Sequence, residues 1–370
     1  MKKDRKEFLT CFTGAISNNK LYVVHEILGT LMEYDLSDFS YRILAKIDLK
    51  VPQKRIEIKG MVIVEDVIYF TLLNSWNVIE YHLKTNQFKI NGEDTQYIEG
   101  KRAIEAMYLY KNKLWLMPYY AGEKVRIFDL ETKQYRIQQI VGSCLDENEK
   151  RTTEKNYVDY ELSQDGMIYA IIYNSKYLVA INMSSEKYTL QNLGDTRKFS
   201  GINYDGKNYW ISDYTNKIIK WNPKDGVLEE HFINALNRDE KREQIRLIYE
   251  KNDEICIIPT YTPYMIILNK KSREIVLKKY HDNIGRIHQN ENRYFFYSGL
   301  VYKDKIILLP LSSNKLVILS KDFEIAQVID NRLNKLDIEK YILKKGGEAE
   351  PIEELYGWGI KEFIEILVDS

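Results

Sequence analysis

His25 and Glu26 stand side by side in the sequence and are the first residues whose types could do chemistry. An imidazole titrates near neutral pH and a carboxylate can share its proton. This pair, together with Asp213, is therefore our candidate for general acid–base catalysis. Adjacent pairs of this kind are more often structural than catalytic, so the sequence leaves open whether the protein is an enzyme.

Metal, redox and nucleotide chemistry have no support in the sequence. The remaining histidines are dispersed, and Cys11, Cys144 and Cys256 show neither zinc-ligand spacing nor a disulfide framework. The chain contains neither a Gly-rich phosphate loop nor a Gly-x-Ser-x-Gly motif. We expect no metal and no cofactor.

Aromatic and basic residues form a second group, which is suited to binding rather than to reaction. Aromatic rings stand between expected strands at Trp76, Tyr119, Tyr120, Tyr173, Tyr214, Tyr261 and Tyr264. Cations precede expected strands at Arg55, Arg102, Arg197, Arg246 and Arg293. A ring of arginines would attract a carboxylate or phosphate, and aromatic faces would hold peptide side chains or sugar rings. The alternative is that the rings seal the core while Glu57, Glu105, Asp159 and Glu161 neutralise the cations.

Residues 199–232 indicate the elements that must position these side chains. Four short runs of aromatic and branched residues are separated by Tyr204-Asp205-Gly206-Lys207, by a polar link at 213–216, and by Asn222-Pro223-Lys224-Asp225-Gly226. Asp-Gly between such runs favours a tight hairpin. The stretch therefore predicts four antiparallel strands, a sheet too small to be stable without neighbours.

The neighbours are six further copies of this stretch. An apolar residue followed by a polar one ends the third expected strand of each copy, at Tyr34-Asp35, Tyr81-His82, Phe128-Asp129, Ile181-Asn182, Trp221-Asn222, Leu268-Asn269 and Leu319-Ser320. The copies recur about every 48 residues, a period typical of propeller blades. We predict an all-β, seven-bladed β-propeller of four-stranded antiparallel blades over 1–330. A short helical tail would follow over 331–370, with an apolar stripe at Ile360, Phe363, Ile364 and Leu367.

The loops at the two ends of the expected blades differ in character. Connections between first and second strands, and between third and fourth strands, are short and made of ordinary turn residues. Connections between second and third strands are longer and carry the candidate aromatic residues. Loops that exceed what a turn requires often carry function, so we place the site on this end, around the mouth of the central channel.

Balanced charge argues against a partner that binds through charge alone. Lys plus Arg and Asp plus Glu each number 54, so no overall field draws nucleic acid or an anionic membrane. No apolar run has the length of a signal peptide or a membrane span. We expect a cytoplasmic protein, and its many Tyr, Lys, Ile and Asn residues are typical of a bacterial source.

The fifth copy, with DGKNYWISDYTNKIIKWNPKDG, resembles repeats of the bacterial seven-bladed β-propeller superfamily in the style of streptogramin-lyase, YVTN and kelch-like repeats. The chain departs from its subfamilies, because it lacks the Gly-Gly doublet of kelch blades, the Trp-Asp dipeptide of WD repeats and the complete sialidase box. The resemblance therefore implies a fold but no catalytic residue.

Three functions remain. The leading hypothesis is a non-catalytic binding or scaffold propeller that engages a peptide or protein on its aromatic and basic loops. The second is a lyase or hydrolase acting on a sugar or an acidic small molecule at the channel mouth. The third is carbohydrate binding without turnover.

Overall fold

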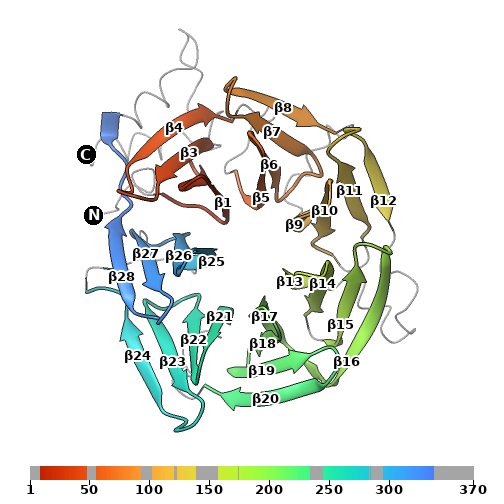
Figure 1. Cartoon of the computed structure of the whole chain (residues 1–370), viewed down its shortest axis with the longest axis vertical. Helices are drawn as coiled ribbons and strands as arrows, with labels where there is room; N and C mark the ends of the chain where they lie inside the picture. Colours follow the sequence, from red (N-terminus) through yellow and green to blue (C-terminus); the bar gives the residue numbers. More distant parts are fainter. Residues whose placement is uncertain are drawn as a thin grey trace, which may run out of the picture. The chain divides into compact units, whose positions relative to one another are not determined.

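A computed structural model describes residues 9–47, 56–92, 102–120, 123–138, 157–173, 175–233, 245–282, 284 and 295–336 (Figure 1). Its elements are strands, arranged as seven four-stranded antiparallel sheets in which consecutive strands pair. The described residues therefore confirm the predicted fold class, an all-β, seven-bladed β-propeller. The expected helical tail lies outside the described residues beyond 336. No described helix is long and apolar enough to cross a membrane.

The first three blades are β1 (Gly14–Ser17), β2 (Lys20–His25), β3 (Thr30–Asp35) and β4 (Tyr41–Lys46); β5 (Ile58–Val64), β6 (Val67–Leu72), β7 (Val78–His82) and β8 (Gln87–Asn91); β9 (Ile104–Tyr110), β10 (Lys113–Pro118), β11 (Val125–Asp129) and β12 (Tyr135–Gln138). The next two are β13 (Tyr157–Leu162), β14 (Met167–Ile172), β15 (Ser175–Asn182) and β16 (Lys187–Arg197); β17 (Phe199–Tyr204), β18 (Tyr209–Asp213), β19 (Lys217–Asn222) and β20 (Gly226–Phe232). The last two are β21 (Ile245–Lys251), β22 (Glu254–Pro259), β23 (Tyr264–Asn269) and β24 (Ile275–Lys279); β25 (Phe296–Tyr302), β26 (Lys305–Pro310), β27 (Lys315–Ser320) and β28 (Ile325–Asp330).

The chain divides into two compact units. Unit 1 comprises 1–72, 79–90 and 281–370, and unit 2 comprises 73–78 and 91–280. Within unit 2 the first strands of successive blades, β9, β13, β17 and β21, are neighbours, as are β25, β1 and β5 within unit 1. The middle strands are buried in apolar clusters, such as that of Trp115, Ile127, Ile168 and Val179 in unit 2. Packing between blades therefore supplies the core that one small sheet lacks.

The repeated polar residue at the end of each third strand has a local role. In six blades its side-chain oxygen accepts backbone N–H bonds at 2.8 to 3.2 Å from residues two to four positions on, at Asp35, Asp129, Asn182, Asn222, Asn269 and Ser320. Such bonds stabilise the turn into the fourth strand. We call this repeated polar residue the marker residue. Four residues after it, the backbone has a positive φ in six blades, at Phe39, Asn86, Lys133, Glu186, Gly226 and Arg273. What recurs in the sequence is therefore the set of residues that forms the turn between the third and fourth strands.

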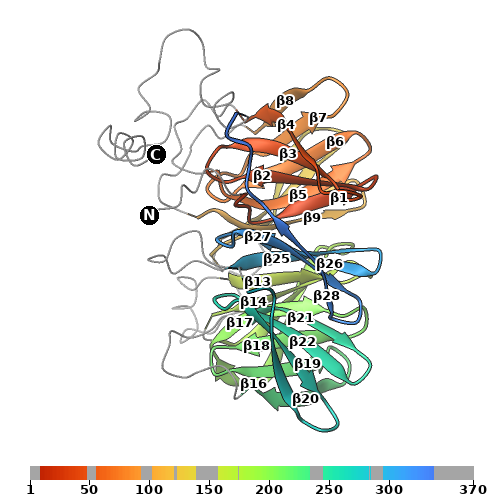
Figure 2. The same cartoon turned by 90° about the vertical axis from the view of Figure 1, so that its left-hand side faces the viewer.

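The first and last blades are joined within unit 1, where Figures 1 and 2 show them beside each other. The backbone N–H of Leu9 donates to Asn331 O at 3.1 Å, and that of Cys11 donates to Pro310 O at 2.9 Å. The Asn331 side chain donates in return to Leu9 O at 3.3 Å. Leu9 and Cys11 are buried against the last blade, so the start of the described chain is fastened to its end.

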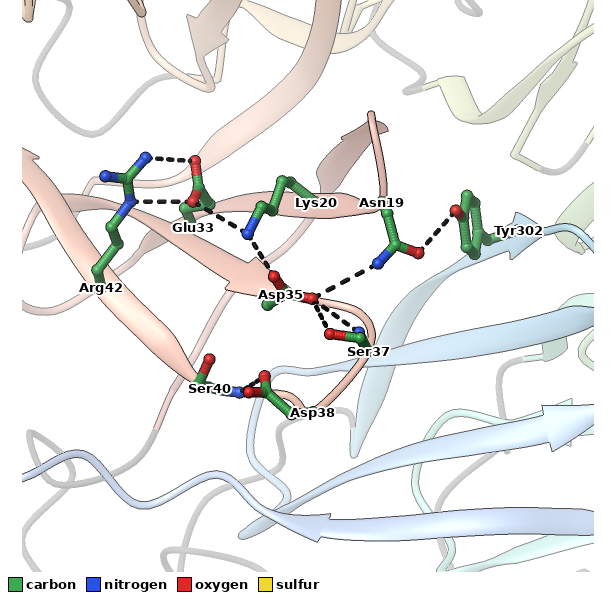
Figure 3. Close-up of polar contacts among 9 residues, drawn as sticks. All are labelled: Asn19, Lys20, Glu33, Asp35, Ser37, Asp38, Ser40, Arg42 and Tyr302. Carbon is green, nitrogen blue, oxygen red and sulfur yellow. Dashed lines mark hydrogen bonds and ion pairs between the residues drawn. The ribbon is translucent and has the colours of Figure 1, made fainter.

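Ion pairs between neighbouring strands stabilise the first blade near its short turns, the β1–β2 and β3–β4 connections (Figure 3). Arg42 donates to both oxygens of Glu33, at 2.9 and 3.0 Å, and Lys20 pairs with Asp35. The hydrogen bonds from Lys20 and Ser37 hold the pKa of Asp35 well below its usual range. The Tyr302 hydroxyl donates to Asn19 at 2.9 Å and links the last blade to the first. The charges on this end therefore have clear structural roles.

Candidate functional site

The aromatic loops of unit 2 follow the second strands of their blades. Because β9, β13, β17 and β21 are neighbours in one unit, the loops that follow their partner strands emerge at one end of that unit. We call this end the aromatic loop face and define it by Tyr119, Tyr120, Tyr173, Tyr214 and Tyr261, together with Trp76, whose segment 73–78 belongs to the same unit and contacts Arg126 of β11. All six rings are partly exposed, which is the state required of a contact surface.

Trp76 stacks with Arg126 of β11, whose guanidinium carbon lies 4.6 Å from the centre of the indole ring. The Trp76 loop is fastened by Tyr135, whose hydroxyl accepts from Val78 N at 2.8 Å and donates to Asn91 O at 2.7 Å. A Cβ on Gly92 would lie 2.0 Å from the Asn77 side chain, so the close approach beside this loop requires glycine. The loop that carries Trp76 is therefore anchored to Tyr135 and lies closely against Gly92.

Tyr119 and Tyr120 form a second aromatic group with Arg102. The two rings meet edge to face with centroids 4.9 Å apart, and the exposed Arg102 guanidinium lies 5.1 Å from the Tyr119 ring centre. The Tyr119 N–H donates to Ala103 O at 2.9 Å, and Tyr119 O accepts from Tyr157 N at 2.8 Å. Tyr119 therefore connects the starts of two successive first strands while presenting its ring to the surface.

Tyr173 and Tyr214 make a further edge-to-face pair, with ring centres 6.0 Å apart. The Tyr214 N–H donates to Lys198 O at 2.8 Å, which repeats the connection made by Tyr119. Tyr261 is half-buried, and Tyr264 begins β23 with 38% of its surface exposed. Among the expected aromatic residues, Tyr173 and Tyr214 thus pair between neighbouring loops, and Tyr119 and Tyr120 pair within one loop.

Of the five arginines expected to form a ring, the structure describes the side chains of two, Arg102 and Arg246. Arg102 is exposed on Tyr119, whereas Arg246 is buried in β21. Arg197 ends β16, and its side chain lies outside the described residues. Arg55 and Arg293 also lie outside the described residues. The two arginines that can be followed have different surroundings, one on the surface and one in the interior.

A β-bulge recurs at the second residue of six first strands, at Lys59, Glu105, Val158, Ser200, Arg246 and Tyr297. A bulge inserts an unpaired residue and re-aims its side chain. In unit 1, Lys59 bonds the Tyr297 hydroxyl and lies 4.3 Å from that ring centre and 5.1 Å from that of Phe12. The bulges therefore bring together side chains that are distant in the sequence.

In unit 2 the bulge residue Arg246 reaches two other blades. One of its Nη atoms donates to Val158 O at 2.6 Å and lies 3.5 Å from Glu105 Oε1. Burial raises the pKa of nearby Asp159 to about 6, although Arg246 opposes the shift. Burial, and then the Asp159 charge, raise the pKa of Glu161 to about 8. Asp159 and Glu161 are two residues apart on β13 and share one face.

These carboxyl groups also have a structural role at the open edges of the first strands. Asp159 accepts from Ile202 N of β17 at 3.3 Å, and Glu161 accepts from Tyr204 N of the same strand. Asn203 of β17 accepts in turn from Ile248 N of β21 at 2.8 Å. Side chains of one first strand thus satisfy backbone donors of the next. The expectation that carboxylates neutralise cations here holds for Glu105 and Arg246.

The candidate catalytic residues take part in turns. His25 is fully buried, and its Nδ1 accepts from Ile27 N at 3.2 Å and from Leu28 N at 3.3 Å. Glu26 is 1% exposed, and its backbone connects Thr10 with Ile56. Asp213 Oδ1 accepts from Thr215 N at 2.8 Å, Thr215 Oγ1 at 2.6 Å and Lys217 N at 3.2 Å. Their catalytic use stays a prediction.

Sequence reasoning named the bulge residues Glu105 and Arg246 but missed Arg126 and the other four, Lys59, Val158, Ser200 and Tyr297. Arg126 lies within an expected strand, and no local pattern shows that its side chain meets Trp76, 50 positions earlier. The bulges do leave a pattern in the sequence. Each of these six first strands begins with an apolar residue, and the bulge residue, whose type varies, comes next. Among the described residues, no group of three or more His, Cys, Asp or Glu could hold a metal ion.

Comparisons with known proteins identify the fold. No family model matches the chain, and no curated protein matches it. Among solved structures, it is similar to virginiamycin B lyase from Staphylococcus aureus, with 12% identity, a TM-score of 0.57 and coverage of 83% of this chain and 93% of that one. It is also similar to YCF48 bound to the D1 peptide, with 10% identity, a TM-score of 0.60 and coverage of 84% and 92%. The β-propeller domain of Cps50 (Swd1) from Myceliophteria thermophila matches with 10% identity, a TM-score of 0.58 and coverage of 85% and 97%. These likenesses show that the chain is a β-propeller, and streptogramin-lyase propellers are among its structural neighbours, as the repeats implied.

Proposed function

We propose that this protein is a non-catalytic binding propeller that engages a peptide or protein partner on the aromatic loop face of unit 2. The observation that carries the proposal is the state of the face. Its residues are partly exposed, and five of its rings are held in pairs, Trp76 with Arg126, Tyr119 with Tyr120 and Tyr173 with Tyr214. The backbone N–H groups of Tyr119 and Tyr214 are hydrogen-bonded to Ala103 and Lys198. Rigid aromatic side chains offer a large contact area at low conformational cost.

Two further observations support binding over catalysis. The side chains of His25 and Asp213 accept backbone hydrogen bonds within turns, which gives them a structural role. A solved propeller of similar fold, YCF48, is bound to a peptide. The fold can therefore present a peptide-binding surface.

Selection from a random peptide display library tests the proposal on the full chain. We expect enriched peptides whose affinity, measured by fluorescence anisotropy, falls at least tenfold in the Tyr119→Ala/Tyr120→Ala double variant. The control is Leu277→Ser on the outer strand β24, where a more exposed apolar residue lies on a fourth strand. Equal loss in the control, or undiminished affinity in the double variant, would reject the proposal.

The second candidate is a hydrolase or lyase, and the carboxyl groups of Asp159 and Glu161 favour it. With a pKa of about 8, Glu161 keeps its proton at neutral pH, while Asp159, with a pKa of about 6, is largely ionised. A protonated acid beside an ionised carboxylate is the arrangement that general acid–base catalysis uses. A panel of nitrophenyl glycosides and esters tests it: turnover by the wild type that Glu161→Gln abolishes supports an enzyme, and equal rates in both exclude this site.

A further inference from the structure

We propose that the β13–β17 seam, the line along which these two first strands lie side by side, opens when Glu161 loses its proton and so makes this part of unit 2 sensitive to pH. The β17–β21 seam lies next to it in the same unit and has Asn203, which does not titrate, at the equivalent position. This property belongs to the joint between blades and is independent of the proposed function.

The two seams share one construction. Glu161 and Asn203 are each the fifth residue of a first strand, and both strands have a bulge at their second residue. Glu161 accepts a hydrogen bond from Tyr204 N of β17, and Asn203 accepts one from Ile248 N of β21 at 2.8 Å. In each seam a side-chain oxygen satisfies a backbone donor at the edge of the next blade. A carboxyl group makes this contact in the first seam, and an amide makes it in the second.

The surroundings of Glu161 make its ionisation unfavourable. Asp159 lies two residues earlier on the same face of β13, and its carboxyl group accepts from Ile202 N of β17 at 3.3 Å. Burial, and then the charge of Asp159, raise the pKa of Glu161 to about 8. Tyr108 of β9 and Tyr249 of β21 lie close enough to feel the Glu161 charge, but burial raises the pKa of both hydroxyls, so they stay neutral in this pH range.

Arg246 of β21 and Glu105 of β9 act on Asp159. Burial raises the pKa of Asp159 to about 6, Arg246 opposes this shift and Glu105 adds to it. Above pH 6 Asp159 is therefore largely ionised. The charge that opposes the ionisation of Glu161 is thus present throughout the range in which Glu161 titrates.

The direction of the effect follows from proton linkage. In an open seam Glu161 is in water and has the pKa of an ordinary glutamate, so opening releases a proton that the closed seam holds. The opening equilibrium therefore rises with pH up to about pH 8 and then levels off. The apolar cluster that includes Tyr169, Ile171, Phe199 and Ile211 holds the fourth and fifth blades together, so we expect the opening to be confined to their first strands.

Amide hydrogen exchange of the full chain, resolved residue by residue by NMR at pH 6 and pH 8.5, tests the inference. Each rate is divided by the intrinsic rate at the same pH, which gives the protection of that amide. Protection of Tyr204 N should fall about tenfold relative to Ile248 N between the two pH values, a figure that allows for the screening of half-buried Glu161 by water.

Two variants assign the effect to Glu161. In Glu161→Gln the relative protection of Tyr204 N should be the same at both pH values, because glutamine keeps the acceptor oxygen and cannot ionise. Asp159→Asn removes the neighbouring charge and leaves the burial, so the fall should be smaller than in the wild type but still present.

The outcomes are distinct. A fall confined to Tyr204 N and absent from Glu161→Gln supports the pH-sensitive seam. Equal falls at Tyr204 N and Ile248 N would show a loosening of the whole unit and overturn the inference. A fall that persists in Glu161→Gln, or constant protection in the wild type, would also overturn it. Peptide binding is not measured here, so failure of the seam leaves the proposed function standing.

Discussion

Replacing Glu161 with glutamine should stabilise the protein at alkaline pH and change little at acid pH. Glu161 lies on β13 beside Asp159, and burial followed by the Asp159 charge raises its pKa to about 8. Glutamine keeps an oxygen that can accept from Tyr204 N but cannot ionise. The substitution therefore removes the cost of a buried charge and preserves the hydrogen bond.

The sign follows from proton linkage. Between the ordinary glutamate pKa and about 8 the folded protein holds a proton that the unfolded chain has released, so stability falls as pH rises through this window. At about 1.4 kcal/mol per pKa unit the full shift corresponds to at most ~5 kcal/mol. Because the side chain is half-buried and water screens it, we expect about 2 kcal/mol. For a chain of this length that corresponds to a melting temperature about 2 to 3 °C higher.

Thermal unfolding at pH 5 and pH 9 measures the effect. Glu161→Gln should exceed wild type at pH 9 and match it more closely at pH 5. Glu186→Gln is the control, because the hydrogen bonds from Arg136 lower the pKa of Glu186 and its loss should destabilise the protein to a similar extent at both pH values. An equal gain for Glu161→Gln at both pH values, or a loss at pH 9, would refute the reasoning.

Three further substitutions test the fold and the site. Arg273→Gly should raise stability by about 0.5 to 1 kcal/mol in thermal unfolding, because Arg273 is exposed with a left-handed backbone where the fifth blade has Gly226; a lower melting temperature would contradict this. Gly201→Ala should lower stability by about 1 to 3 kcal/mol, because its Cβ would lie 2.3 Å from Ile245 O, whereas Lys224→Ala in an exposed turn should be nearly neutral. Tyr135→Phe should weaken binding of a selected peptide by several fold with a loss of about 1 to 3 kcal/mol in stability, because it releases Val78 N and Asn91 O; unchanged affinity would show that the Trp76 loop is fixed by other contacts.

The blades could be predicted because their signals are local. The marker residues, such as Asp129 and Asn182, accept hydrogen bonds from N–H groups two or three positions further along the chain. Their role can therefore be recognised from a few adjacent residues. The polar residue recurs in all seven copies and makes these bonds in six of them, and the period of about 48 residues is the one typical of propeller blades. The position of the aromatic residues on loops between second and third strands was also predictable, since these loops exceed what a turn needs, but the sequence left open whether their rings are exposed or seal the core.

The contacts between blades could not be predicted in the same way. Arg126 meets Trp76 and Arg246 meets Glu105 only because separate first strands and loops come together in the folded unit. A bulge adds one residue to a strand and so breaks the alternation of inward and outward side chains. The bulge at Arg246 therefore changes which way its side chain points, and the alternating sequence pattern cannot reveal this. His25 and Glu26 could suggest catalysis in the sequence, because no local pattern reveals that both become buried.

Hydrogen–deuterium exchange of the full chain, with and without a selected peptide, tests the binding site most directly. Bound peptide should slow exchange at 73–78, 102–104, 119–120 and 123–126, where Trp76, Tyr119 and the neighbouring Arg102 and Arg126 lie, and leave the turn at 204–208 unchanged. Slower exchange confined to the turn at 204–208, with no change around Trp76 and Tyr119, would contradict the assignment of the aromatic loop face as the binding surface.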